Sequence, residues 1–255
     1  MRPETAIDSW QQWGGELGNR PVIIKSLDGG RSNRSFLLES TDKKMVLRLN
    51  GADTMLPGAK RSNELLIWQA ASKQGIAPPL LHVDQQSRYL VSAYIPNHLP
   101  AKPPISSQFI GQALSLLKQC HQIDIAVPAI DYAAHIAHYW RTIEQKHTLL
   151  NPNLPAQRTP MQETLEALLN SNPTTGLCHH DPVTANFVGS KTRLYLVDWE
   201  YAANGLLVMD YAALGIEWKI DDKVIIKQTG LEAEPLTMAK TLYKYLCALW
   251  EELTA

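Results

Sequence analysis

A run of prolines near residue 100 separates two stretches of sequence with different patterns. Pro96, Pro100, Pro103 and Pro104 mark a loop rather than the interior of a helix or strand. Short segments with strand-like alternation come before them, and mostly longer segments with helical periodicity come after them. Strands followed by helices predict an α+β protein, with a first part at 1–96 and a second part at 97–255.

Two β-hairpins are predicted in the first part. The strands of the first are expected at 22–27 and 34–39, and those of the second at 80–84 and 88–95. The tip of the first hairpin is small and polar, with Gly29, Gly30, Ser32 and Asn33. Adjacent glycines let backbone N–H groups approach an anion closely, although such a pair is more often a simple turn.

A buried ion pair is predicted between the third strand and the first long helix of this part. In the segment 44–50, Arg48 lies on the opposite strand face from three apolar residues, Met45, Leu47 and Leu49. The segment 60–75 predicts a helix that ends at a glycine and carries on one side Glu64, Ile67, Trp68 and Ala71. A carboxylate on a packed face needs a cationic partner, and we expect Arg48 to provide it.

The second part is predicted to be mainly helical. Apolar residues at helical spacing indicate helices at 106–122, 132–150, 160–169 and 236–253.

One polar series stands between the short apolar runs of the second part. His179, Asp181 and Asn186 form the pattern H-x-D-x-x-x-x-N, and Asp198 follows at the end of a predicted strand. A carboxylate near an acceptor hydroxyl, followed by an amide oxygen and a second carboxylate for Mg²⁺, is the order of groups that phosphoryl transfer requires. The competing interpretation is a divalent-metal hydrolase centre at residues 179–181, but a second His/Asp cluster with ligand spacing is missing from the sequence.

The residues 178–186, the segment 197–201 and the downstream Asp210 resemble the superfamily of choline kinases, thiamine kinases and aminoglycoside phosphotransferases. The resemblance extends over about residues 27–214, and its motifs are specific only in the second part of the chain. It implies a two-lobed, protein-kinase-like fold, with a small antiparallel β lobe and a larger, mainly α-helical lobe. It also implies ATP and Mg²⁺ as the nucleotide and the metal.

The resemblance assigns roles to the residues of the polar series. Asp181 would be the catalytic residue that takes the proton of the acceptor hydroxyl. Asn186 and Asp198 would hold Mg²⁺ through hard oxygen ligands. His179 would brace the loop, and Asp210 would anchor the loop backbone from a following helix.

The resemblance also predicts a nucleotide site in the first part. Arg48 stands where these enzymes place a phosphate-binding cation, with Glu64 as the helix carboxylate that holds it. Arginine replaces the lysine of protein kinases here, and it can still bind carboxylate and phosphate bidentately. The hairpin tip would cover the nucleotide, and the backbone of Tyr94 and Ile95 would pair with the purine. The tip carries fewer glycines than the protein-kinase loop.

Paired aromatic and acidic residues suggest the acceptor. Trp199 precedes Glu200, and Glu217 precedes Trp218. Aromatic faces with carboxylates suit a cationic amine, so choline, ethanolamine or a thiamine-like alcohol is expected, although helical tryptophans more often lie in a core. Aminoglycosides are disfavoured because the chain has no conspicuous acidic insertion. A catalytically inactive, nucleotide-binding pseudokinase remains an alternative, whereas a protein acceptor is disfavoured because an A-P-E-like segment is missing after Asp198.

Composition narrows the remaining classes of partner and location. With 24 Lys and Arg against 25 Asp and Glu, no basic field suggests nucleic acid. The sequence has no run of about 18 apolar residues that could span a membrane, and its start lacks the features of a signal peptide, so we expect a soluble, cytoplasmic protein. Its expected partners are a nucleotide and a small-molecule acceptor, with no obligate protein partner. Three separated cysteines argue against a disulfide framework.

Overall fold

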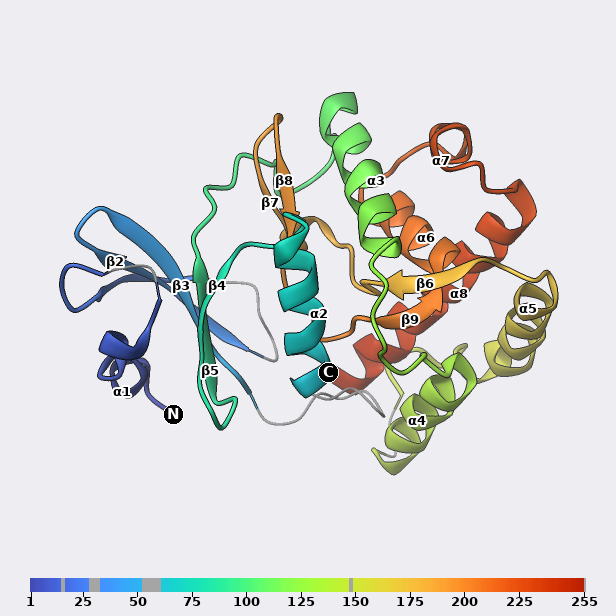
Figure 1. The fold of residues 1–255 in the computed structure, drawn as a ribbon. Coiled ribbons are helices and arrows are strands. Elements are labelled where there is room, and N and C mark those ends of the chain that lie inside the picture. The colour runs from blue at the N-terminus through green and yellow to red at the C-terminus, as the bar shows by residue number, and fades with distance from the viewer. Residues whose placement is uncertain (15–16, 28–32, 52–60, 147–148, 255) are drawn as a thin grey trace. The chain divides into compact units, whose positions relative to one another are not determined.

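The computed structural model describes residues 1–14, 17–27, 33–51, 61–146 and 149–254. They form two compact units (Figure 1). Unit 1 contains the described residues up to Leu99 together with Phe187–Glu200, and unit 2 contains Pro100–Asn186 and the described residues from Tyr201 onward. The predicted division at residue 96 assigned 187–200 to the second part, whereas the structure places this segment in unit 1.

Unit 1 is built on an antiparallel five-stranded sheet with the strand order β1-β2-β3-β5-β4. Both predicted hairpins are present. The strands are β1 (Val22–Leu27), β2 (Arg34–Ser40), β3 (Lys43–Leu49), β4 (Leu80–Val83) and β5 (Tyr89–Ala93).

The core of unit 1 lies on one face of this sheet. Met45, Leu47 and Leu49 of β3 are buried there with Leu38 and Val91, against the N-terminal helix α1 (Pro3–Ile7) and the 3₁₀ turn η1 (Trp10–Gln12). This is the strand face that the alternation predicts, because successive side chains of a strand point to opposite sides.

Arg48 points to the other side of β3, where the helix α2 (Arg61–Lys73) presents its buried face. The buried residues of α2 are the four that the sequence predicts, Glu64, Ile67, Trp68 and Ala71. The two-stranded sheet of β7 (Phe187–Gly189) and β8 (Leu194–Leu196) joins unit 1 through two backbone bonds. The Leu196 amide donates to the Ile76 carbonyl at 2.8 Å, and the His98 amide donates to the Gly189 carbonyl at 2.7 Å.

Unit 2 is mainly helical. Its helices are α3 (Ser107–His121), α4 (Tyr132–Gln145), α5 (Arg158–Asn170), α6 (Leu207–Glu217), α7 (Asp222–Thr229) and α8 (Ala233–Thr254), with 3₁₀ turns η2 (Pro155–Gln157) and η3 (Thr184–Asn186). The short strands β6 (Thr175–Cys178) and β9 (Ala203–Leu206) pair antiparallel. The long helix α8 packs against α4, α5 and α6.

This combination of an antiparallel sheet and a helical unit confirms the predicted α+β fold class. Across the described ranges, every helix is too short or too polar to cross a membrane.

Removing a core side chain of β3 should destabilise unit 1. Leu47→Ala deletes a fully buried side chain, and we expect it to lower the free energy of unfolding by about 2 to 5 kcal/mol. Leu66→Ala on α2 is the matched control: Leu66 is 50% exposed, so its loss should cost less than about 0.5 kcal/mol. Urea unfolding followed by tryptophan fluorescence measures both. Equal costs would show that the face of β3 has been assigned wrongly.

Candidate functional site

The polar series of the sequence forms a loop directly after strand β6. β6 ends at Cys178, and the chain runs through His179, His180 and Asp181 to the turn η3, which ends at Asn186. The pairing of Cys178 with Ala203 of β9 fixes the start of this loop. His180 has a left-handed backbone with φ of +63°, a conformation that is uncommon for any residue other than glycine.

Asp210 anchors the loop from the first turn of α6. Its side chain is completely buried and accepts hydrogen bonds from two successive loop amides, His179 N to Oδ2 and His180 N to Oδ1, both at 2.8 Å. His121 Nε2 lies 3.0 Å from the same Oδ2. Asp210 therefore holds the loop backbone, as expected, and His179 is fully buried.

The environment of Asp210 favours its charged form. Burial alone would raise the pKa of this carboxyl, but the His121 hydrogen bond and the neighbouring imidazoles of His121, His180 and His179 outweigh burial and lower the pKa to about 2. The two backbone amides and the N-terminal position on α6 also suit an anion. The loop is therefore held by a carboxylate that is ionised at neutral pH.

Asp181 and Asn186 are joined within the loop. Asn186 Nδ2 donates to Asp181 Oδ2 at 2.7 Å and to the Asp181 carbonyl at 2.9 Å. Both donor hydrogens of the amide are therefore used to orient Asp181. The remaining polar atom of Asn186 is its Oδ1 oxygen, which is an acceptor of the kind that Mg²⁺ prefers.

Three other groups could be taken for a metal site. His121, Cys178 and Asp210 bring one potential ligand atom each within 4.8 Å of one another. However, both Asp210 oxygens already accept hydrogen bonds, and burial raises the pKa of the Cys178 thiol well above its usual value. Because the Asp210 carboxylate is committed to the loop amides, we describe this group as the loop anchor.

In unit 1 the predicted ion pair between β3 and α2 is present. Arg48 Nη2 lies 2.5 Å from Glu64 Oε1, and both side chains are buried. Arg48 Nη1 also donates to Asp198 Oδ1 at 3.2 Å. Asp198 follows β8 and has a left-handed backbone with φ of +64°. The structure thus brings three of the predicted residues of unit 1 together.

Arg61 belongs to the same cluster and was missed in the sequence. Its Nη1 donates to Glu64 Oε2 at 3.0 Å and lies 3.7 Å from Glu200 Oε2, and its Nη2 donates to Asn33 Oδ1 at 2.9 Å. The signal that could have identified it is its position three residues before Glu64 on one helix face. Two arginines therefore share the buried Glu64 carboxylate.

Of the two segments predicted to contact the nucleotide, the structure describes Tyr94 and Ile95 but only one residue of the hairpin tip, Asn33. Gly29, Gly30 and Ser32 lie outside the described residues. The Tyr94 amide donates to the Lys44 carbonyl at 3.2 Å. A purine edge would consequently have to pair with the Tyr94 carbonyl or with the backbone of Ile95.

The structure corrects the predicted binding role of two tryptophans. Trp199 is 0% exposed and Trp218 is 1% exposed. Large aromatic side chains gain most from burial, and here both indoles are core residues whose faces are not open to a ligand. Glu200 is also buried, and it accepts a hydrogen bond from Asn33 Nδ2 at 3.0 Å.

Glu217 differs from the two tryptophans in its exposure to solvent. It is partly exposed at the end of α6, and it accepts a hydrogen bond from the Tyr243 hydroxyl at 3.1 Å. The pKa of Tyr243 is raised, first by burial and then by neighbouring Cys247, Glu217 and Asp181. Because Glu217 and Asp181 both act on the same phenol, the two carboxylates lie in one neighbourhood of unit 2. Sequence reasoning missed Tyr243 because it lies inside an ordinary helical apolar pattern.

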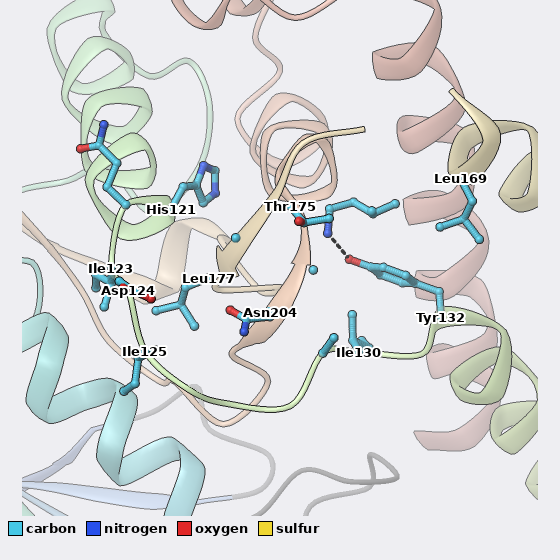
Figure 2. Close-up of a pocket in the computed structure, with 15 residues that line it drawn as sticks. His121, Ile123, Asp124, Ile125, Ile130, Tyr132, Leu169, Thr175, Leu177 and Asn204 are labelled. Carbon is cyan, nitrogen blue, oxygen red and sulfur yellow. Dashed lines mark hydrogen bonds between the residues drawn. The ribbon is translucent and has the colours of Figure 1, made fainter. Parts of the chain in front are cut away.

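A separate pocket of about 570 Å³ lies beside the two-stranded sheet of β6 and β9 (Figure 2). The end of α3, the connection to α4, and strands β6 and β9 contribute its walls. Figure 2 shows Tyr132 and Asn204 at this pocket. Asp181, Asn186 and Glu217 are not part of the described lining, so this pocket is distinct from the loop site.

The chain is similar to known phosphotransferases and kinases. Residues 23–235 match the model of a family described as the phosphotransferase enzyme family. A thiamine kinase of Escherichia coli O139:H28 is 27% identical over 202 residues, which cover 76% of this chain and 66% of that enzyme. The chain thus matches just under two thirds of the length of this relative.

Two solved structures show the same fold. A choline/ethanolamine kinase family protein from Mesorhizobium loti has a TM-score of 0.76 and 21% identity, covering 98% of this chain and 85% of that one. A spectinomycin phosphotransferase in complex with ADP and spectinomycin has a TM-score of 0.68 and 14% identity, covering 100% and 89%.

The Asp210 anchor predicts a specific loss of stability in acid. A pKa lowered from 3.8 to about 2 means that the carboxylate stabilises the fold by about 2 kcal/mol above pH 4, and that this contribution is lost as the pH falls from about 4 to about 2. Asp210→Asn should therefore show a flatter decline in the free energy of unfolding over this range. The exposed Asp124→Asn is the control and should follow the wild type. Parallel curves for wild type and Asp210→Asn would contradict the anchor.

Proposed function

Because the chain belongs to the phosphotransferase enzyme family, we propose that it transfers the γ-phosphoryl group of ATP to a hydroxyl of a small, cationic metabolite. The observation that carries this proposal is the loop after β6, in which an anchored backbone presents Asp181 with its carboxylate held by Asn186. Phosphoryl transfer depends mainly on positioning and electrostatic stabilisation, and this loop provides positioning.

Asp181 is the proposed catalytic residue. One of its carboxylate oxygens accepts the hydrogen bond from Asn186, which holds the carboxylate in place for an acceptor hydroxyl. Asp181 would accept the hydroxyl proton as the new bond to phosphorus forms. A carboxylate is sufficient for this step because the transition state is loose and little base strength is needed.

Asn186 and Asp198 are the proposed ligands of Mg²⁺, and Arg48 is the proposed phosphate contact. The Asn186 amide fits a metal because its nitrogen is committed to Asp181 and its oxygen is left for a cation. When bound, Mg²⁺ supplies positive charge that neutralises phosphate oxygens. Arg48 already pairs with Glu64 and Asp198, and Glu64 would keep the guanidinium in place when a phosphate contacts it.

The acceptor is proposed to be a cationic alcohol of the choline, ethanolamine or thiamine type. Glu217 and Asp181 place two carboxylates near the phenol of Tyr243, so this neighbourhood attracts positive charge. Thiamine and choline, which give their names to the relatives, are small cationic alcohols. With Trp199 and Trp218 in the core, the carboxylate of Glu217 replaces them as the main recognition group.

An aminoglycoside-type acceptor is the second candidate. It is favoured by the structural likeness to a spectinomycin phosphotransferase, because that acceptor is also a cation with hydroxyl groups. A pseudokinase, which would bind nucleotide without transferring phosphate, is the third. The complete set of Asp181, Asn186 and Asp198 argues against it.

Removal of the catalytic carboxylate should abolish transfer while leaving nucleotide binding intact. We expect Asp181→Asn to lower kcat by about 10²- to 10⁴-fold, because the hydroxyl loses its proton acceptor. A coupled assay of ATP consumption with choline, ethanolamine, thiamine and spectinomycin measures this loss. Thermal shift with MgATP should be unchanged in Asp181→Asn but reduced in Asp198→Ala.

Two outcomes would decide against these assignments. Near wild-type turnover in either Asp181→Asn or Asp198→Ala would show that the proposed roles are wrong. Magnesium-dependent ATP binding by the wild type without transfer to any acceptor in the panel would favour the pseudokinase.

Loss of charge at Glu217 should weaken acceptor binding alone. We expect Glu217→Gln to raise KM for a cationic alcohol by roughly 10- to 100-fold, which corresponds to the loss of one charge-assisted contact. KM for ATP should be unchanged. Glu163→Gln, an exposed change on α5, is the matched control. An equal rise in KM for a neutral alcohol would mean that Glu217 does not recognise charge.

A further inference from the structure

The residue before Asp181 is held in its unusual backbone conformation from two sides. His180 has a φ of +63°, a left-handed conformation that is uncommon for residues other than glycine. On the backbone side, Asp210 Oδ1 accepts a hydrogen bond from the His180 amide at 2.8 Å. On the side-chain side, His180 Nε2 lies 2.9 Å from the hydroxyl of Tyr132.

The Tyr132 hydroxyl has a defined hydrogen-bond direction. It accepts a hydrogen bond from the Leu206 amide at 3.1 Å, which Figure 2 marks with a dashed line. Its own hydrogen is therefore available for His180 Nε2. Burial lowers the pKa of His180, so the ring is neutral near pH 7 and this nitrogen can accept. The two groups therefore share a hydrogen bond, and the tautomer of the imidazole decides which of them donates.

Tyr132 is itself fixed at the first turn of α4. The preceding residue, Asp131, caps this helix by accepting a hydrogen bond from the Ala134 amide at 2.9 Å. The Tyr132 side chain is buried. The hydroxyl therefore sits at a position set by both α4 and β9, and it transmits that position to the imidazole of His180.

Gly205 of β9 provides the space in which Tyr132 and His180 meet. A Cβ atom at this position would lie 2.5 Å from His180 Nε2 and 2.6 Å from the Tyr132 hydroxyl. Any side chain here would separate the two groups. The glycine is required by this close approach and not by its own backbone conformation.

We propose that Tyr132, His180 and Gly205 form a clamp that fixes the turn before Asp181 and thereby positions the Asp181 carboxylate for catalysis. None of the three needs to touch substrate: they are positioning residues that act through the loop backbone. This inference rests on the proposed catalytic role of Asp181. Misplacing a catalytic group by about 1 Å can cost about 100-fold in rate, so a change in the clamp should affect kcat.

Tyr132→Phe is the direct test because it removes the hydroxyl and keeps the ring. We expect kcat to fall by about 10-fold and KM for ATP to change by less than about 2-fold, since the lost interaction acts on the reacting geometry. Gly205→Ala should have the same effect by separating the pair. Tyr245→Phe is the matched control: it removes a buried hydroxyl that accepts a hydrogen bond from Trp140 Nε1 at 2.7 Å, and it should leave kcat unchanged.

A double-mutant cycle separates positioning from general destabilisation. His180→Gly tolerates the left-handed backbone but lacks the imidazole. If the clamp acts through the ring, Tyr132→Phe should lower kcat in the wild type and have no further effect in His180→Gly. Equal effects of Tyr132→Phe in the two backgrounds would overturn the clamp.

Hydrogen exchange tests the clamp without any assay of turnover. In Tyr132→Phe, amides of residues 178–186 should exchange about 10-fold faster than in the wild type, and Tyr245→Phe should not change them. Unchanged exchange, or an unchanged kcat in a folded Tyr132→Phe protein, overturns the proposal. If the wild type transfers no phosphate to any acceptor, the proposed function fails, and faster exchange would still support the clamp as a loop restraint.

Discussion

The arrangement of unit 2 depends on one buried negative charge. A carboxylate removed from water is costly unless it is paired and hydrogen-bonded, and Asp210 meets this condition with two loop amides and His121. The same bonds that satisfy the charge dictate the path of the loop after β6. The hydrogen bonds that Asp210 of α6 needs therefore fix the conformation of the loop. The residues of the proposed chemistry in this loop, Asp181 and Asn186, are held in place by the same bonds.

Unit 1 contains a buried positive charge, that of Arg48, which also needs partners of opposite charge. Arg48 lies between Glu64 and Asp198, and Arg61 adds a second cation to Glu64. Each guanidinium group therefore has carboxylate partners, and this pairing offsets part of the cost of removing the charges from water. In this network Glu64 is fully engaged by arginine, whereas the Asp198 side chain is 30% exposed. Of the two carboxylates that contact Arg48, Asp198 is therefore better able than Glu64 to exchange it for another cation.

Periodicity predicted the elements well because it reports which face of an element is buried. The buried face of α2, including Glu64, and the pairing of that residue with Arg48 followed from spacing of 3.6 and 2 residues. Pairing with an acidic neighbour in the sequence was a poorer guide to which aromatic residues bind a ligand. Trp199 and Trp218, which were predicted to do so, are core residues. The contact between Tyr132 and His180 spans 48 positions and depends on a glycine in β9. Because no local pattern encodes such a contact, His180 received no role from the sequence.

The bond between Asn186 and Asp181 explains why position 186 carries an amide. An aspartate there would have nearly the same shape, but its carboxylate would face another carboxylate oxygen at the 2.7 Å now spanned by the hydrogen bond. Like charges at that distance repel each other, so the pKa of one of the two acids would be raised. The protonation of the two acids would then depend on whether a ligand is bound beside them. Asparagine offers an oxygen of similar reach while keeping the charge state of Asp181 independent of its neighbour.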